Sequence, residues 1–333
     1  MKVAALKNNK FTVEDIPTPE IMPNTKGAVI KVRGCGLCGS DIVKFKNGTA
    51  KDGAVLGHEI VGNIVEINSD TSFKIGDRVV SGHHIPCFEC NYCLDGNYSM
   101  CRHFKQTNIV PGGFSEYIFV SEEHLKNTVF KVDDKLSDIE ASFTEPLACC
   151  IRAVKRAELR DNSKCLIIGL GTIGLLMGQA VNAYGNEAYG CDIIKDRVEL
   201  SEKYNFKKSF VPEDEANIKN ITNGMGFDRV FLTAGAKSSI DTALKSVRDG
   251  GTIIVFSSIK SDDGFKNNDI YYRELTVKSS YSASPEDLRD SLLFITSGKI
   301  NVSKLSVCYP LDKINEAIDD TLSNKIMKAY ITI

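Results

Sequence analysis

The chain has 333 residues, a formal net charge of −2, 42% hydrophobic residues and 25% charged residues, which is ordinary for a globular protein of about two domains. The near-zero charge gives no electrostatic basis for binding nucleic acid or an anionic membrane. No apolar run approaches the roughly 18–20 residues of a membrane helix, and the opening MKVAALK predicts a short strand rather than a signal peptide. We therefore expect a cytoplasmic protein.

Short β-like runs broken by Gly, Pro and Asn dominate residues 1–148. Residues 27–32 and 60–67 predict strands, and residues 74–80 predict a turn that leads into a strand. Apolar residues then follow helical spacing from Glu145 to Leu159. This part of the chain predicts a folded-over β domain that ends at a helix.

Strands and helices alternate in the next part of the chain. The predicted strands are 164–169, 188–192, 229–232 and 252–256, and the predicted helices are 172–183, 196–204 and 239–246. Such alternation predicts an α/β fold with a doubly wound parallel sheet. The pattern becomes mixed after about residue 275, and residues 326–333 again predict a strand.

A Gly-x-Gly-x-x-Gly motif at residues 169–174 follows one predicted strand and opens a predicted helix, as in dinucleotide-binding sheets. Asp192 ends the next strand. A carboxylate at this place accepts hydrogen bonds from the adenosine ribose hydroxyls and repels a 2′-phosphate, so the pattern favours NAD over NADP. Lys195 and Arg197 follow closely and could tolerate a phosphate. The predicted cofactor-binding residues are Gly169, Gly171, Thr172, Ile173, Gly174, Asp192 and Arg197.

Eleven cysteines are a large number for a reducing compartment, where metal binding is a better explanation than disulfides. Four of them are packed closely together with two-residue gaps, and four thiolates saturate a tetrahedral zinc ion and leave no open position. These predicted ligands of a structural zinc ion are Cys87, Cys90, Cys93 and Cys101.

A second set of possible metal ligands lies nearer the N-terminus. Cys38 offers a sulfur and His58 a nitrogen, while Glu59 and Glu145 offer carboxylates. A catalytic zinc ion takes about three protein ligands and keeps one exchangeable position. These residues therefore predict a catalytic zinc site, and the pattern leaves open which carboxylate completes it.

The whole chain resembles the zinc-containing alcohol dehydrogenases of the medium-chain dehydrogenase/reductase type, and within them the sorbitol (polyol) and threonine dehydrogenase branch. The resemblance rests on Gly-x-Cys-Gly-Ser-Asp, Gly-His-Glu, Gly-Asp-Arg-Val, the four-cysteine lobe, Glu-Pro-Leu and the glycine motif, in this order. It implies a GroES-like catalytic domain at 1–148 with a zinc lobe at about 87–101, a Rossmann NAD-binding domain at 149–277 and a return to the catalytic domain at 278–333.

The resemblance also implies roles for single residues. Cys38 and His58 match the catalytic zinc ligands, and Glu145 matches the third ligand of the polyol branch. Glu59 matches a glutamate that lies beside the zinc and exchanges with water or substrate. Ser40 matches the hydroxyl that touches the substrate alcohol and begins proton release, and Asp41 matches the carboxylate that orients the ligand histidine.

The expected activity is hydride transfer between NAD and a secondary alcohol, most readily a polyol or sugar alcohol, with two zinc ions per chain. The expected assembly is a homotetramer or, second, a homodimer, in which the predicted strand from Thr252 to Ser257 could pair across subunits at a sheet edge. Three alternatives stand beside this one: a threonine-type amino-alcohol dehydrogenase, a zinc-free quinone reductase relative, and a non-catalytic zinc-binding structural protein of the same fold. Val43 occupies the position of a relay histidine found in many relatives, and His83 or His84 are candidate substrate contacts.

Overall fold

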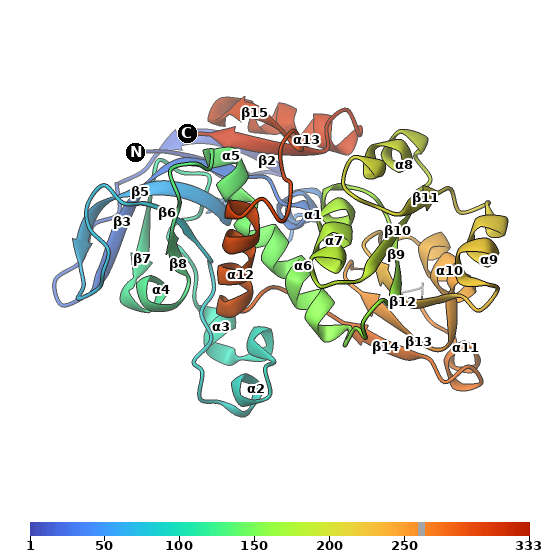
Figure 1. Cartoon of the computed structure of the whole chain (residues 1–333). Helices are drawn as coiled ribbons and strands as arrows, with labels where there is room; N and C mark the ends of the chain where they lie inside the picture. Colours follow the sequence, from blue (N-terminus) through green and yellow to red (C-terminus); the bar gives the residue numbers. More distant parts are fainter. Residues whose placement is uncertain (259–263) are drawn as a thin grey trace. The chain divides into compact units, whose positions relative to one another are not determined.

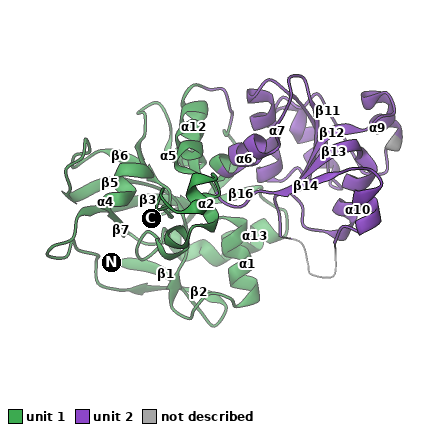
Figure 2. Cartoon of the chain, turned by 90° about the horizontal axis from the view of Figure 1, so that it is seen from below, with its two compact units in different colours: residues 1–148, 283–297, 302–333 green, residues 149–282, 298–301 purple. Residues whose placement is uncertain are grey.

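The computed structural model describes residues 1–258 and 264–333, which fall into two compact units (Figure 2). Unit 1 comprises residues 1–148, 283–297 and 302–333, and unit 2 comprises residues 149–282 and 298–301. Helix α6 (Thr144–Arg156) begins in unit 1 and continues into unit 2. Within the described residues, no helix combines the length and the hydrophobicity needed to span a bilayer.

Unit 1 is built on two sheets (Figure 1). The smaller sheet has the order β2-β1-β4, and its strands are β1 (Lys2–Lys7), β2 (Lys10–Asp15) and β4 (Ala54–Val55). The larger sheet has the order β15-β16-β3-β5-β6-β8, with β7 also paired to β3. Its strands are β3 (Gly27–Gly36), β5 (Glu59–Asn68), β6 (Arg78–Ser81), β7 (Tyr117–Ser121), β8 (Val129–Lys131), β15 (Ser306–Pro310) and β16 (Lys328–Thr332).

The helices of unit 1 are short and lie between these strands or after them in sequence. They are α1 (Gly39–Asn47), α2 (Asn91–Leu94), η1 (Tyr98–Met100), α3 (Arg102–Gln106), α4 (Glu122–Asn127), α5 (Asp138–Ser142), α12 (Pro285–Thr296), η2 (Leu311–Lys313) and α13 (Ile314–Leu322). Several begin with a Ser side chain that accepts the backbone N–H three residues later, as Ser284 does in α12. These caps fix where each helix starts.

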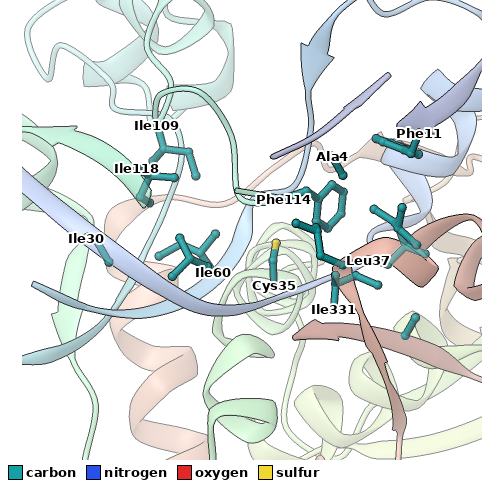
Figure 3. Close-up of a cluster of buried hydrophobic side chains, with 14 of the residues drawn as sticks. Ala4, Phe11, Ile30, Cys35, Leu37, Ile60, Ile109, Phe114, Ile118 and Ile331 are labelled. Carbon is teal, nitrogen blue, oxygen red and sulfur yellow. The ribbon is translucent and has the colours of Figure 1, made fainter. Parts of the chain in front are cut away.

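The core of unit 1 lies where strands distant in sequence meet (Figure 3). Phe114, Ile60 and Ile331 are fully buried there, and Cys35 is buried among them. Burial raises the pKa of the Cys35 thiol well above its ordinary value, and the charges of Glu59 and Asp41 raise it further. Cys35 is therefore an inert core thiol, in contrast to the half-buried Cys38.

Unit 2 contains a six-stranded sheet with the order β11-β10-β9-β12-β13-β14, and all its strand pairs are parallel. Its strands are β9 (Lys164–Ile168), β10 (Glu187–Cys191), β11 (Lys208–Phe210), β12 (Phe227–Leu232), β13 (Val247–Val255) and β14 (Thr276–Ser279). Its helices besides α6 are α7 (Thr172–Ala183), α8 (Lys195–Glu202), α9 (Glu215–Thr222), α10 (Lys237–Ser246) and α11 (Asn267–Tyr271). The predicted α/β fold with a doubly wound parallel sheet is confirmed.

One expectation about this sheet is wrong. The segment from Thr252 to Ser257 was expected to offer a free sheet edge for pairing between subunits. The structure instead places β13 between β12 and β14, so both of its edges are already hydrogen-bonded. The outer strand on this side is β14, whose short sequence Thr-Val-Lys-Ser gives a weak strand signal.

Candidate active site

Three side chains that could hold a metal ion meet where β3 ends and β5 begins. Cys38, His58 and Glu59 each offer a ligand atom, and these atoms lie within 4.8 Å of one another. The antiparallel register pairs Gly36 with Glu59, which brings the chain after β3 beside the chain before β5. Sulfur, imidazole nitrogen and carboxylate oxygen are all zinc donors, so this set fits the ion.

Cys38 also starts helix α1. Its Sγ atom accepts the backbone N–H of Ser40 at 3.5 Å, and its own N–H donates to a carboxylate oxygen of Asp41 at 3.3 Å. Ser40 lies exposed in the first turn of the helix, two residues after the thiol. The capping interactions therefore fix the sulfur at the start of the helix, with Ser40 in the first helical turn after it.

Asp41 orients His58. The Asp41 carboxylate is buried, and its Oδ1 lies 3.6 Å from Nδ1 of His58. Burial opposes charge on both groups, but their mutual attraction prevails: the pKa of Asp41 is lowered and that of His58 is raised well above its ordinary value. Because Nδ1 faces Asp41, the other ring nitrogen, Nε2, is the one available to a metal ion.

Lys328 is a member of this site that the sequence analysis missed. Its Nζ lies 2.6 Å from Oε2 of Glu59 and donates to the carbonyl of Leu37 at 3.2 Å, with both charged side chains buried. Burial lowers the pKa of Lys328, but the charges of Glu59 and Cys38 outweigh it and the pKa is raised. A side chain at Gly36 would collide with this pair, since its Cβ would lie 1.9 Å from Glu59 Oε2.

The four-cysteine lobe forms a second cluster around the short helices α2, η1 and α3. Its Sγ atoms lie within 4.8 Å of one another, with contacts of 3.5 Å between Cys101 and Cys87 and 3.6 Å between Cys90 and Cys93. Zinc–sulfur bonds of about 2.3 Å in a tetrahedron place sulfurs about 3.8 Å apart. The observed spacing therefore fits one zinc ion, and Phe104 packs behind it in a small buried cluster.

The glycine motif follows β9 and runs into the first turn of α7, and its three glycines are required for different physical reasons. Gly169 has a φ of +97°, and a Cβ on Gly174 would lie 1.8 Å from the Gly169 carbonyl oxygen. A Cβ on Gly171 would meet only a guanidinium nitrogen of Arg197, at 3.9 Å, so the surrounding protein does not require glycine there. This space lies at the N-terminus of α7, whose backbone N–H groups suit a diphosphate.

Asp192 follows β10 and is almost fully buried. Its carboxylate accepts the backbone N–H of Leu170 at 2.6 Å and that of Ile194 at 2.8 Å, and Arg197 Nη1 lies 3.8 Å away. The carboxylate therefore ties the glycine loop to the start of α8. The structure brings Asp192, Arg197 and the glycine motif together, as a ribose and diphosphate site requires.

Comparisons with known proteins agree with this geometry. A model of the alcohol dehydrogenase GroES-like domain matches residues 24–133, and one of the zinc-binding dehydrogenases matches residues 172–297. D-xylulose reductase A of Aspergillus niger is 31% identical, with 97% of this chain and 94% of that protein covered. Sorbitol dehydrogenase of Bacillus subtilis is 34% identical, with 77% and 74% covered. The chain belongs to the zinc-containing alcohol dehydrogenase family.

Solved structures show the same fold over the whole chain. Galactitol-1-phosphate dehydrogenase from Escherichia coli is 25% identical with a TM-score of 0.87, and both chains are covered completely. An E. coli oxidoreductase of unknown specificity is 28% identical with a TM-score of 0.89, over 100% of this chain and 99% of that one. The predicted family is confirmed: this alcohol dehydrogenase is an oxidoreductase for small-molecule alcohols that uses zinc and a nicotinamide dinucleotide. The alternatives outside alcohol oxidation are not favoured.

Glu145, the other candidate carboxylate ligand, lies in the first turn of α6 and outside the group formed by Cys38, His58 and Glu59. It lines a small cavity together with Glu59, Ser142 and Thr144. Because Lys328 holds Glu59, Glu145 is the carboxylate we expect to complete the zinc shell in this alcohol dehydrogenase.

We expect Glu145→Gln to lower zinc affinity or activity by about 10–100-fold, the range for changes around a metal site. Zinc content after dialysis and kcat/KM measure this effect, with the exposed Glu20→Gln as control. Full zinc occupancy and full activity of Glu145→Ala would show that Glu145 is not a ligand and would leave Glu59 as the third one.

The position of the missing relay histidine lies on α1, where Val43 is 53% exposed. Two other histidines follow β6: His83 packs against the His58 ring, and His84 packs against His83. Both were named as candidate substrate contacts, but only the structure shows that one of them touches a candidate zinc ligand. Sequence spacing carries no signal for that contact, because it joins two separate loops.

Proposed function

We propose that this alcohol dehydrogenase oxidises a secondary hydroxyl of a polyol or sugar alcohol with NAD and catalyses the reverse reduction of the ketone. The observation that carries the proposal is the cluster of Cys38, His58 and Glu59 with Asp41 behind the histidine. The relatives named for xylulose, sorbitol and galactitol-1-phosphate support the substrate class. In this proposal unit 1 carries the catalytic zinc and unit 2 binds NAD.

Each residue has a role in this proposal. When bound, zinc supplies Lewis-acid polarisation of the alcohol, and nicotinamide accepts a hydride. Cys38, His58 and Glu145 hold the ion, and Asp41 fixes the His58 tautomer. Ser40, exposed beside Cys38, accepts the hydroxyl proton and passes it outward. Lys328 holds Glu59 in place next to the ligands.

The test is NADH formation on a panel of polyols, sugar alcohols, secondary alcohols and threonine, with and without a chelator. Chelator-sensitive activity that is greatest on polyols is the expected result. Greatest activity on threonine would replace the proposal by the amino-alcohol alternative, and no activity on any of these compounds would overturn it. We also propose two zinc ions per chain, the second in the four-cysteine lobe. A cytoplasmic location remains a prediction.

The preference for NAD should depend on Asp192. With NADP, repulsion of the 2′-phosphate and loss of a ribose hydrogen bond together cost on the order of 2–3 kcal/mol. The ratio of kcat/KM for NAD to that for NADP should therefore be roughly 30–150. Asp192→Ser removes the charge and one of the two oxygens that accept the backbone N–H groups of Leu170 and Ile194, so the ratio should fall toward unity. Kinetics with both cofactors measure it, and the exposed Asp196→Ser is the matched control. Equal use of both cofactors by the unmodified enzyme would contradict this prediction.

We propose a homo-oligomer, a tetramer before a dimer, in which β14 rather than β13 supplies the free sheet edge. Tyr271, Tyr272 and Tyr281 flank this strand and are 69%, 78% and 66% exposed. An unpaired edge strand with exposed aromatic neighbours suits pairing with a second copy. Light scattering should give a molar mass that is a multiple of the 36.6 kDa chain. The double variant Tyr271→Asp with Tyr272→Asp should weaken the association of the subunits. A species of 36.6 kDa alone would rule the assembly out.

A further inference from the structure

Four aromatic rings lie in a row in which each ring contacts the next, and the row begins at the candidate zinc ligand His58. The ring centroids are 4.7 Å apart between His58 and His83, 4.0 Å between His83 and His84, and 4.8 Å between His84 and Phe104. His83 is half-buried, and it is the ring in this row that contacts His58 directly. A substrate oxygen bound next to His58 would therefore have His83 as a neighbour.

The backbone around His83 is fixed from two sides. Buried His124 donates from Nε2 to the His83 carbonyl at 3.2 Å, and its Nδ1 pairs with the Ser121 hydroxyl at 2.8 Å. Burial lowers the pKa of His124 to about 4, so it is neutral at pH 7. On the other side, Nδ1 of His84 bonds to the carbonyl of Thr107. The position of His83 thus does not depend on hydrogen bonds from its own ring.

Neither ring nitrogen of His83 has a hydrogen-bond partner within residues 1–258 and 264–333. A buried imidazole nitrogen normally has a hydrogen-bond partner, so the two ring nitrogens of His83 are available to a ligand. A neutral imidazole offers one donor and one acceptor, which matches the donor and acceptor of a hydroxyl group.

We infer that His83 is a specificity-determining residue that binds the hydroxyl next to the reacting carbon and so favours vicinal diols over simple secondary alcohols. This inference rests on the proposed function and names the residue that selects its substrate. His84 and His124 act as positioning residues, because they hold the His83 backbone and ring without reaching the substrate themselves. Ser40 accepts the proton of the reacting hydroxyl, and His83 forms a hydrogen bond with the neighbouring hydroxyl.

The test compares xylitol, a polyol, with 2-butanol, a secondary alcohol without a second hydroxyl. His83→Phe keeps a ring against His58 but removes both nitrogens, and loss of one hydrogen bond corresponds to about tenfold in affinity. We expect KM for xylitol to rise about tenfold, with kcat changed less, while kcat/KM for 2-butanol stays within about twofold. His83→Gln, which restores a donor and an acceptor, should recover part of the loss. His103→Phe, at a partly exposed histidine away from His58, is the matched control.

Zinc content and thermal stability of His83→Phe should equal those of the parent, since the ring contact with His58 is kept. An equal loss on both substrates, or no loss on xylitol, would overturn the inference while leaving the dehydrogenase function intact. A parent enzyme that oxidises 2-butanol as well as xylitol contradicts it too. A parent inactive on both alcohols overturns the proposed function and this inference together.

Discussion

Replacing Cys38 by serine is expected to abolish alcohol oxidation while leaving the protein folded. The change removes the one sulfur donor from the cluster with His58 and Glu59, and a hydroxyl is a poor zinc ligand. Loss of metal polarisation, worth several kcal/mol, corresponds to at least about 10³-fold in kcat/KM. The core around Cys35 is untouched, so the melting temperature should match that of the parent after a chelator has removed the same zinc ion.

Metal analysis separates this result from general damage. Cys38→Ser should retain one zinc ion per chain, held by the four-cysteine lobe, where the parent is expected to hold two. Dialysis of the parent against a chelator should reproduce the same state, because the mixed-donor site is open and the thiolate site is closed. Cys308→Ser, at an exposed cysteine on β15, is the matched control and should keep both ions and full activity. A fully active Cys38→Ser enzyme with two zinc ions would refute the site.

Lys328→Met should strongly destabilise the folded protein. It leaves the Glu59 carboxylate, which is fully buried, without its ion-pair partner at 2.6 Å. Removing one member of a buried pair typically costs about 3–5 kcal/mol, because the remaining charge stays desolvated. We expect a loss of this size in the free energy of unfolding by urea, measured on the chelated protein so that bound metal does not contribute.

Three further variants test the physical reason. Lys328→Arg keeps the charge and should lose much less stability. The double variant Lys328→Met with Glu59→Gln removes both charges and should recover most of the loss, and together with the single variant Glu59→Gln it gives the coupling between the two residues. If the double variant is as unstable as the two single changes added together, the pair is not coupled and Lys328 contributes only packing, for example against Phe143.

The sequence predicts the part of the fold that local patterns encode. The alternation of strands and helices from β9 to β13 predicts the parallel sheet, because buried parallel strands appear as short apolar runs. It fails at β11 and β14, where three- and four-residue strands carry Lys, Ser and Thr. Such short polar strands are defined by their neighbours in the sheet. Without β14, the sequence predicts β13 as the edge strand, and this prediction is wrong.

The same division between local and distant information applies to the candidate site. The four cysteines of the lobe lie within one loop, so spacing alone groups them, whereas Asp41, three residues after Cys38, is identified only through the family resemblance. Lys328 donates to Leu37 across 291 residues, and no local pattern marks a lysine in a C-terminal strand as part of a metal site. The packing of His83 on His58 is also a product of tertiary structure.

The two candidate metal sites also differ in how much of the chain must be made before their ligands can meet. Cys87 and Cys101 are 14 positions apart, so the lobe closes a short loop. The end of β3, just before Cys38, pairs Gly36 with Tyr330 of β16, and Leu37 donates to the carbonyl of Ala329 at 3.0 Å. On the ribosome the lobe can therefore take up its ion early, whereas the strand before Cys38 lacks one neighbour until residues 328–332 emerge. Metal loading at Cys38 is then expected to be among the last steps in the maturation of the newly made chain.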